Sequence, residues 1–170
     1  VFLINDAAAD TFIQELKEKL SAIPAGVMLN KNICGNYYTA RTKAIKEDNV
    51  KVLHEGADES SSTKGSPALL KVAAADFVAN PNLQNEIFGP ASLLIICNDK
   101  AAMLKALASV HGQLTGTVMG NTADYTEFAD CIHVLSSKVG RLIYNGVPTG
   151  VEVCHAMVHG GPFPATTDAR

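Results

Sequence analysis

The chain has 170 residues, of which 47% are hydrophobic and 18% charged, and its formal net charge is −3. This composition is typical of a globular domain and excludes disordered and collagen-like chains. The 14 basic residues are scattered among 17 acidic ones, without the basic run that nucleic-acid binding needs. The longest apolar run, residues 93–97, is too short to span a membrane. We therefore expect a single domain over residues 1–170, with neither a nucleic-acid nor a membrane partner.

Strand-like and helical patterns alternate along the first half of the chain. Asp6 or Asp10 can cap a helix that Pro24 ends, and Asn30 or Asn32 can cap a second helix. A polar, serine-rich stretch over residues 56–65 predicts an exposed loop. The strands predicted in this half are residues 1–4, 49–53 and 69–73.

The second half alternates strands and helices more regularly. Residues 76–90 predict an irregular segment, and Asp99 and Thr122 can cap the two helices that follow it. The strands predicted here are residues 92–97, 114–119 and 141–144. Strands separated by helices imply parallel pairing, so we expect an α/β fold with three αβα layers and a mostly parallel sheet. The last 25 residues, rich in Gly and Pro, predict an ordered loop of the kind that binds ligands in such folds.

The segment 85–90, Asn-Glu-Ile-Phe-Gly-Pro, combines a carboxylate, an aromatic ring and a Gly-Pro turn. Because side chains alternate along an extended segment, Glu86 and Phe88 can project the same way. A carboxylate can accept two hydroxyl hydrogen bonds from a ribose, and a ring beside it can pack on a flat heterocycle. Residue chemistry alone favours the opposite interpretation, in which Phe88 is part of the core and Glu86 is solvated.

Other combinations of reactive side chains give weaker signals. Cys154 and His155 are neighbours that point to opposite faces of an extended chain, so packing is favoured, and a thiol hydrolase built on Cys154 is an alternative. His155 and His159 have helical metal-ligand spacing, but residues 160–162 disfavour a helix and no third ligand follows, so we expect no metal site. Four cysteines without a CxxC pair indicate reduced thiols and a cytoplasmic protein.

Three motifs resemble, in order and spacing, the C-terminal half of an aldehyde dehydrogenase catalytic domain. The resemblance covers essentially the whole chain. The run from Pro148 to Pro162 most resembles the branch that oxidises 2-oxoglutarate semialdehyde and the related NADP-dependent fatty-aldehyde enzymes. The motifs are Asn85-Glu86-Ile87-Phe88-Gly89-Pro90, Gly112-Gln113-Leu114-Thr115-Gly116-Thr117 and Asn145-Gly146-x-Pro148-Thr149-Gly150.

This resemblance implies a parent enzyme that oxidises an aldehyde to a carboxylic acid with NAD or NADP, through a cysteine thioester. It implies that Glu86 holds the nicotinamide ribose and that Phe88 contacts the nicotinamide ring. It further implies that Pro148, Gly150 and His159 shape the aldehyde pocket. A homo-oligomer is expected for the parent protein.

In the family, the nucleophilic cysteine, the catalytic glutamate and the cofactor domain precede the strand that matches residues 1–4. We therefore expect this chain to be a piece of the catalytic domain that holds no catalytic residue, binds no nicotinamide cofactor alone and is inactive alone. The alternative is a freestanding α/β module that binds a small ligand through its C-terminal loops or regulates a partner.

Overall fold

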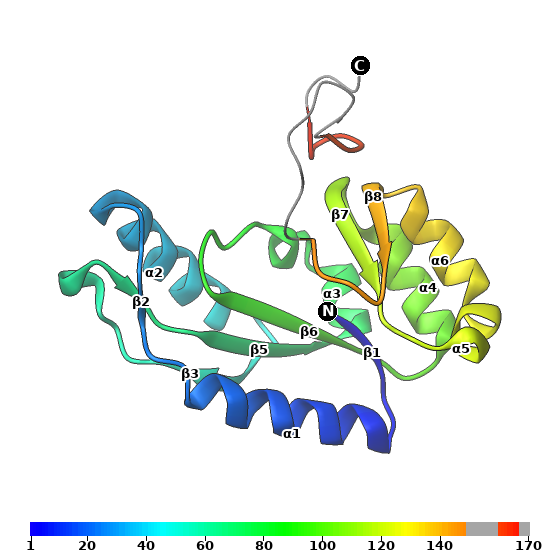
Figure 1. The fold of residues 1–170 in the computed structure, drawn as a ribbon, viewed down its shortest axis with the longest axis horizontal. Coiled ribbons are helices and arrows are strands. Elements are labelled where there is room, and N and C mark those ends of the chain that lie inside the picture. The colour runs from blue at the N-terminus through cyan, green and yellow to red at the C-terminus, as the bar shows by residue number, and fades with distance from the viewer. Residues whose placement is uncertain (149–159, 167–170) are drawn as a thin grey trace. The chain divides into compact units, whose positions relative to one another are not determined.

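The computed structural model describes residues 1–148 and 160–166, and the chain divides into two compact units, Val1–Met103 and Leu104–Arg170 (Figure 1). Helix α4 (Lys100–Ser109) crosses the boundary between the units. The first unit contains β1 (Phe2–Ile4), α1 (Ala7–Ser21), β2 (Gly26–Val27), α2 (Lys31–Ile45), β3 (Lys51–Glu55), η1 (Ser60–Ser62), β4 (Lys64–Gly65), β5 (Ala68–Ala73), α3 (Ala74–Ala79), η2 (Pro81–Gln84) and β6 (Ala91–Cys97). The second contains β7 (Gln113–Val118), α5 (Thr122–Glu127), α6 (Ala129–Ser136) and β8 (Val139–Tyr144). The expectation of one domain over the whole chain stays a prediction.

The first unit is built on a four-stranded sheet in the order β1-β6-β5-β3. Strands β1, β6 and β5 run parallel, and β3 pairs antiparallel at the edge. Leu69 and Leu70 are both buried although they point to opposite faces of the sheet, as expected for a central strand covered on both sides. The predicted α/β fold with a mostly parallel sheet is confirmed.

Helix α1 covers one face of this sheet. Ile13 packs on Leu69 and Leu94, which are fully buried. The apolar residues that surround this cluster recur at three- and four-residue steps on the helix and at alternate positions on the strands. They are Leu3, Leu16, Leu20, Leu53 and Ile96.

Helices α2 and α3 cover the opposite face. Phe2 on β1 meets Phe77 on α3 edge to face, with ring centroids 5.8 Å apart. Ala44 on α2 lies near Leu70 and Leu93, which belong to neighbouring strands in register. Because Figure 1 places α1 on the other side of the sheet from α2, the unit has the predicted three αβα layers.

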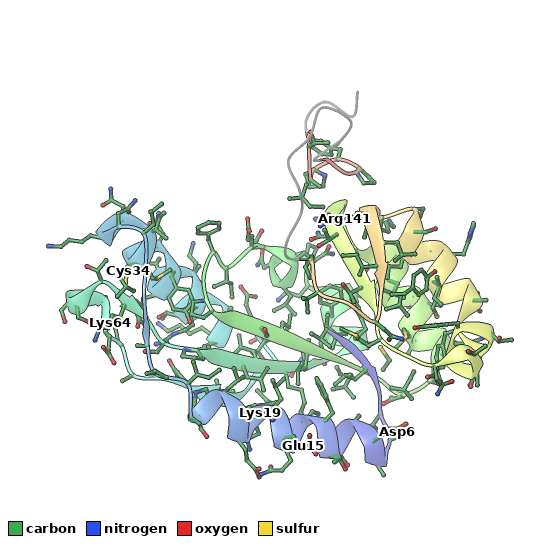
Figure 2. The ribbon with its side chains drawn as sticks, in the orientation of Figure 1. Asp6, Glu15, Lys19, Cys34, Lys64 and Arg141 are labelled. Carbon is green, nitrogen blue, oxygen red and sulfur yellow. The ribbon has the colours of Figure 1, made fainter. Side chains whose placement is uncertain are left out.

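The start of α1 follows the predicted capping chemistry. The Asp6 carboxylate accepts a hydrogen bond from the backbone N–H of Ala9 at 2.8 Å. Lys19 lies in the last turn, where a cation interacts favourably with the helix dipole. Figure 2 shows Asp6 and Lys19 near opposite ends of the helix, with Glu15 between them. Of the two caps considered for α2, Asn30 is the one used, through a 2.9 Å bond from Ile33.

The second unit pairs β7 and β8 in parallel, with α5 and α6 between them in sequence. Parallel pairing was expected for the strands of this half, but β6 belongs to the sheet of the first unit and not to that of β7. The cap of α5 is Asn121 and not Thr122. Its side chain and that of Asp124 form a reciprocal capping box.

The segment predicted as irregular contains two short helices, α3 and η2. Pro81 begins η2, where its missing N–H costs nothing. The serine-rich stretch at 56–65 also forms β4, which pairs with β2. None of the helices in the described ranges is long and apolar enough to cross a membrane.

Candidate cofactor-binding loop and its support

Residues 85–90 form an extended loop between η2 and β6 in the first unit. Glu86 is exposed, Ile87 is half-buried, and Phe88 is exposed over 63% of its surface. This alternation turns Ile87 toward the protein and both of its neighbours toward solvent. The interpretation that places Phe88 in the core is wrong. The ring of Phe88 is instead accessible beside the exposed carboxylate of Glu86.

The loop rests on a buried cluster on α2. Ile87 packs against Cys34, Tyr37 and Tyr38, all of which are buried. The turn itself lies on the ring of Tyr37, because a Cβ on Gly89 would overlap Cδ2 of that ring. The loop is thus held from behind while its outer side chains stay accessible.

Backbone hydrogen bonds join the end of the loop to the sheet. The Pro90 carbonyl accepts from the N–H of Ala68 at 2.9 Å, at the start of β5. The N–H of Ala91 donates to the Gly89 carbonyl at 2.8 Å, which closes the turn. Glu86 and Phe88 therefore project from a segment whose turn is fixed by a parallel strand pair.

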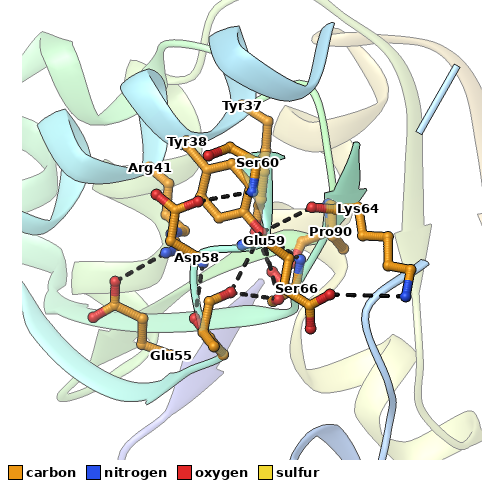
Figure 3. Close-up of polar contacts among 12 residues, drawn as sticks. Tyr37, Tyr38, Arg41, Glu55, Asp58, Glu59, Ser60, Lys64, Ser66 and Pro90 are labelled. Carbon is orange, nitrogen blue, oxygen red and sulfur yellow. Dashed lines mark hydrogen bonds and ion pairs between the residues drawn. The ribbon is translucent and has the colours of Figure 1, made fainter. Parts of the chain in front are cut away.

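A polar cluster behind this loop is drawn in Figure 3. The Tyr38 hydroxyl donates to the Lys64 carbonyl at 2.9 Å and accepts from the N–H groups of Glu59 and Ser66 at 3.0 and 3.2 Å. The Ser66 hydroxyl donates in turn to the Ala57 carbonyl at 2.6 Å. The Tyr38 hydroxyl thus ties helix α2 to the serine-rich stretch and to Ser66 just after it.

The buried charge in this cluster is that of Arg41, which is 4% exposed. Its guanidinium forms an ion pair with Glu55 at 3.2 Å, donates to the Gly56 carbonyl at 3.2 Å and lies 4.5 Å from the Tyr38 ring centroid. The carboxylate of Glu55 is 42% exposed, so the pair lies at the rim and not in the interior. These contacts offset part of the cost of burying a cation, although Nε of Arg41 is buried without a hydrogen-bond partner among the described residues.

Two pKa shifts accompany this arrangement. Burial raises the pKa of the Tyr37 hydroxyl above its ordinary value. Hydrogen bonds from the side chain and backbone of Ser60 lower the pKa of the exposed Asp58 carboxyl.

A small hollow of about 170 Å³ lies on the inner side of the loop. Its lining is mainly apolar, with Leu70, Leu93 and Ile87 among the contributing residues. Asn82 and Asn85 contribute polar groups. Because Glu86 and Phe88 are not part of the lining, the hollow belongs to the support of the loop and not to the predicted cofactor contact.

The second predicted site falls in the other unit, after β8. Pro148 is exposed and follows the Asn145-Gly146 turn, whereas Gly150 and His159 lie outside the described residues. The segment 160–163 lies against the starts of β7 and β8: the Gly112 N–H donates to the Phe163 carbonyl at 3.2 Å. A Cβ on Gly140 would overlap the Gly160 carbonyl.

The sequence placed Tyr37 on the apolar face of the second helix but did not predict that the loop rests on this face. Tyr37, Tyr38 and Arg41 lie on one face of α2 at i, i+1 and i+4, and an arginine on the apolar face of a helix was the available signal. The metal-ligand spacing of His155 and His159 lies outside the described residues, so the expectation of no metal site stays a prediction. Among residues 1–148 and 160–166, no three His, Cys, Asp or Glu side chains are grouped to hold a metal ion. Cys34, Cys97 and Cys131 are buried, and Cys154 lies outside the described residues.

Sequence comparison finds relatives among curated enzymes. The chain is 39% identical over 168 residues to α-ketoglutaric semialdehyde dehydrogenase 2 of Azospirillum brasilense, matching 99% of this chain and 32% of that protein. It is 35% identical to the α-ketoglutaric semialdehyde dehydrogenase of Acinetobacter baylyi, matching 98% of this chain and again 32% of the relative. The chain thus spans about a third of the length of these relatives. No family model matches it.

Structure comparison finds the same fold in more distant proteins. The Δ-pyrroline-5-carboxylate dehydrogenase of Mycobacterium tuberculosis, solved with NAD, has a TM-score of 0.75 at 18% identity, over 98% of this chain and 31% of that one. The glyceraldehyde-3-phosphate dehydrogenase GapN of Methanocaldococcus jannaschii, solved with NADP, has a TM-score of 0.68 at 20% identity, over 94% and 34%. At these identities the likeness concerns the fold alone.

Proposed function

We propose, from the premise that the chain belongs to the aldehyde dehydrogenase superfamily, that its residues form part of the catalytic domain of an NAD(P)-dependent aldehyde dehydrogenase. The premise comes from the 39% and 35% identity to α-ketoglutaric semialdehyde dehydrogenases over nearly all of this chain. The names of these relatives support 2-oxoglutarate semialdehyde as the substrate.

The observation that carries the proposal is the exposed pair Glu86 and Phe88, which lie on a loop packed against α2. A carboxylate at this position can accept hydrogen bonds from both hydroxyls of a ribose, and the ring of Phe88 can pack on the flat nicotinamide. The residues therefore fit one wall of a nicotinamide nucleotide site. When bound, the nucleotide supplies the hydride acceptor of the reaction.

The role of these two residues is binding and orientation. A hydride is transferred only over a short distance and along a defined direction, so a rigid wall that fixes the nicotinamide ring contributes to the rate. Glu86 would hold the sugar and Phe88 would limit tilting of the ring and exclude water from one side. The turn at Gly89 and Pro90, joined to β5, would keep both contacts in place.

The chemical step needs a thiolate nucleophile and a base, and we propose that both lie in other segments of the protein. The buried thiols of Cys34, Cys97 and Cys131 support this, because a buried thiol cannot reach an aldehyde carbonyl. The loop after β8 would contribute Pro148, Gly150 and His159 to the aldehyde pocket. Such a loop lies at the carboxyl ends of parallel strands, where α/β proteins bind ligands.

Two further expectations belong to this proposal. The protein is expected in the cytoplasm, where thiols stay reduced. It is also expected to be a homo-oligomer. The large exposed apolar side chains Val27 and Leu29, 81% and 86% exposed in the first unit, are consistent with further protein packing there.

The test is a turnover assay of the full-length protein with 2-oxoglutarate semialdehyde and with a long-chain aldehyde, each with NAD and with NADP. We expect oxidation of 2-oxoglutarate semialdehyde to be preferred, with no turnover by residues 1–170 alone. Preference for the long-chain aldehyde would replace the proposed substrate. Lack of oxidation with either nucleotide would favour the freestanding binding module instead.

A further inference from the structure

The turn of the candidate cofactor loop has a buried aromatic side chain directly behind it. Tyr37 on α2 has no exposed surface, and a Cβ on Gly89 would overlap its ring. The φ of Gly89 lies outside the left-handed region, so glycine is needed here for close approach and not for its backbone angles. The loop backbone therefore sits directly on the Tyr37 ring.

Tyr37 is itself fixed from several sides. Its hydroxyl donates to the Ser66 carbonyl at 2.5 Å and lies 3.4 Å from the Pro90 carbonyl. The ring of Tyr38 meets it edge to face, with centroids 5.0 Å apart. The Arg41 guanidinium lies 5.7 Å from its ring centroid. A ring held in this way cannot yield when the loop is pushed against it.

We propose that Tyr37 is a positioning residue for nicotinamide binding: its ring sets the height of the Gly89-Pro90 turn and thereby the place from which Glu86 and Phe88 reach the nucleotide. This inference rests on the proposed function of the loop. Phe88 is adjacent to Gly89, and Glu86 is three residues before it, so a shift of the turn moves both contacts. A misplacement of about 1 Å can cost an enzyme about 100-fold in rate.

The ring and the hydroxyl of Tyr37 can be tested separately in the full-length protein. In Tyr37→Leu the ring is lost, and we expect the Kd of NADH or NADPH, measured by their fluorescence, to rise at least about tenfold, which is about 1.4 kcal/mol. Tyr37→Phe keeps the ring and should bind within about twofold of the unsubstituted protein, a difference of about 0.4 kcal/mol. The matched control is Phe77→Leu, which removes another buried ring, from α3.

A second measurement reports on the loop without the nucleotide. Amide hydrogen exchange over residues 83–92 should become faster in Tyr37→Leu and stay unchanged in Phe77→Leu and Tyr37→Phe. This separates displacement of the loop from a general loss of stability. The KM of the aldehyde should stay unchanged, because Tyr37 acts only through the loop.

Gly89→Ala tests the same contact from the loop side, and it provides the test if Tyr37→Leu does not fold. The new Cβ would overlap the Tyr37 ring, so nucleotide binding should weaken by about tenfold or more and exchange over 83–92 should rise. In the Tyr37→Leu background the smaller side chain leaves more room. The effect of Gly89→Ala should therefore be smaller there, a coupling that a double-mutant cycle measures.

The outcomes distinguish this inference from the function on which it rests. If the unsubstituted full-length protein binds neither NADH nor NADPH, the proposed function is wrong and the inference is overturned with it. If the unsubstituted protein binds a nucleotide and Gly89→Ala and Tyr37→Leu bind it as tightly as Phe77→Leu, the inference alone is overturned.

Discussion

The side-chain amide of Asn145 forms a closed ring of two hydrogen bonds with the backbone of Gly120. Its Oδ1 accepts from the Gly120 N–H at 2.9 Å, and its Nδ2 donates to the Gly120 carbonyl at 2.8 Å. Gly120 follows β7 and Asn145 follows β8, so the ring joins the carboxyl ends of two parallel strands. Asn145 adopts a left-handed φ of 47° to do so. Three residues later the chain reaches Pro148, the start of the proposed aldehyde loop.

Substitutions of Asn145 should separate the contribution of its two hydrogen bonds from the cost of its left-handed backbone conformation. Asn145→Ala loses both hydrogen bonds and places a Cβ at a left-handed φ, so we expect a loss of about 1–2 kcal/mol in the free energy of unfolding. Asn145→Gly loses the same bonds but accepts the backbone angle and should cost less. Denaturant unfolding of both variants checks this order. Equal stability of Asn145→Ala and the unsubstituted protein would show that the ring contributes nothing.

The Arg41 and Glu55 ion pair predicts an asymmetric mutational response. Arg41→Lys keeps the charge but loses the planar group that reaches Glu55, the Gly56 carbonyl and the Tyr38 ring together, so we expect a loss of about 2 kcal/mol. Glu55→Gln removes a partly exposed carboxylate and should cost about 1 kcal/mol or less. Thermal unfolding of the two variants makes the comparison. A larger loss for Glu55→Gln would mean that the ion pair, and not stacking, holds Arg41.

The buried hydroxyl of Tyr37 predicts a loss of stability at alkaline pH. Because burial raises its pKa, the folded protein holds this proton more tightly than the unfolded chain. The resulting stabilisation is complete below the unfolded pKa near 10 and decreases as pH rises above it. The difference in unfolding free energy between the unsubstituted protein and Tyr37→Phe should therefore shrink from about pH 9 to about pH 11. A constant difference over this range would contradict the shift.

Phe88 and Phe77 offer a matched pair for separating binding from stability. Phe88→Ala removes a side chain that is 63% exposed, so the free energy of unfolding should change by less than about 0.5 kcal/mol. Phe77→Ala removes a side chain that is 4% exposed and should cost about 3–5 kcal/mol. Denaturant unfolding gives both values. A large loss in Phe88→Ala would mean that its ring packs in the folded protein and is not available to a ligand.

Local chemistry predicted most of the helices and strands. Asp6 and Asn30 cap α1 and α2 as expected, since a cap depends only on residues within one turn. Short elements were harder to predict: α3 and η2 are too brief for a helical period to appear in the sequence. The pairing of β2 with β4 was not predicted either, because strands of two residues show no alternation of apolar and polar side chains.

Contacts between residues far apart in sequence limited what could be predicted of the site. The alternation in residues 85–90 indicated that Glu86 and Phe88 share a side, and the exposure of both agrees with it. Their support by Tyr37 depends on a packing contact across about fifty residues, which no local pattern encodes. For the same reason the sequence did not predict that β6 and β7 belong to different sheets, since strand order is set by long-range pairing.

The most direct test of the proposed cofactor loop is nucleotide binding by Glu86→Gln in the full-length protein. Glu15→Gln is the matched control, because it makes the same chemical change at an exposed position on α1, on the other side of the sheet (Figure 2). We expect the Kd of the preferred nucleotide to rise about tenfold in Glu86→Gln, as loss of a charged hydrogen bond to a ribose predicts, and to be unchanged in Glu15→Gln. Equal binding by the two variants would contradict the account.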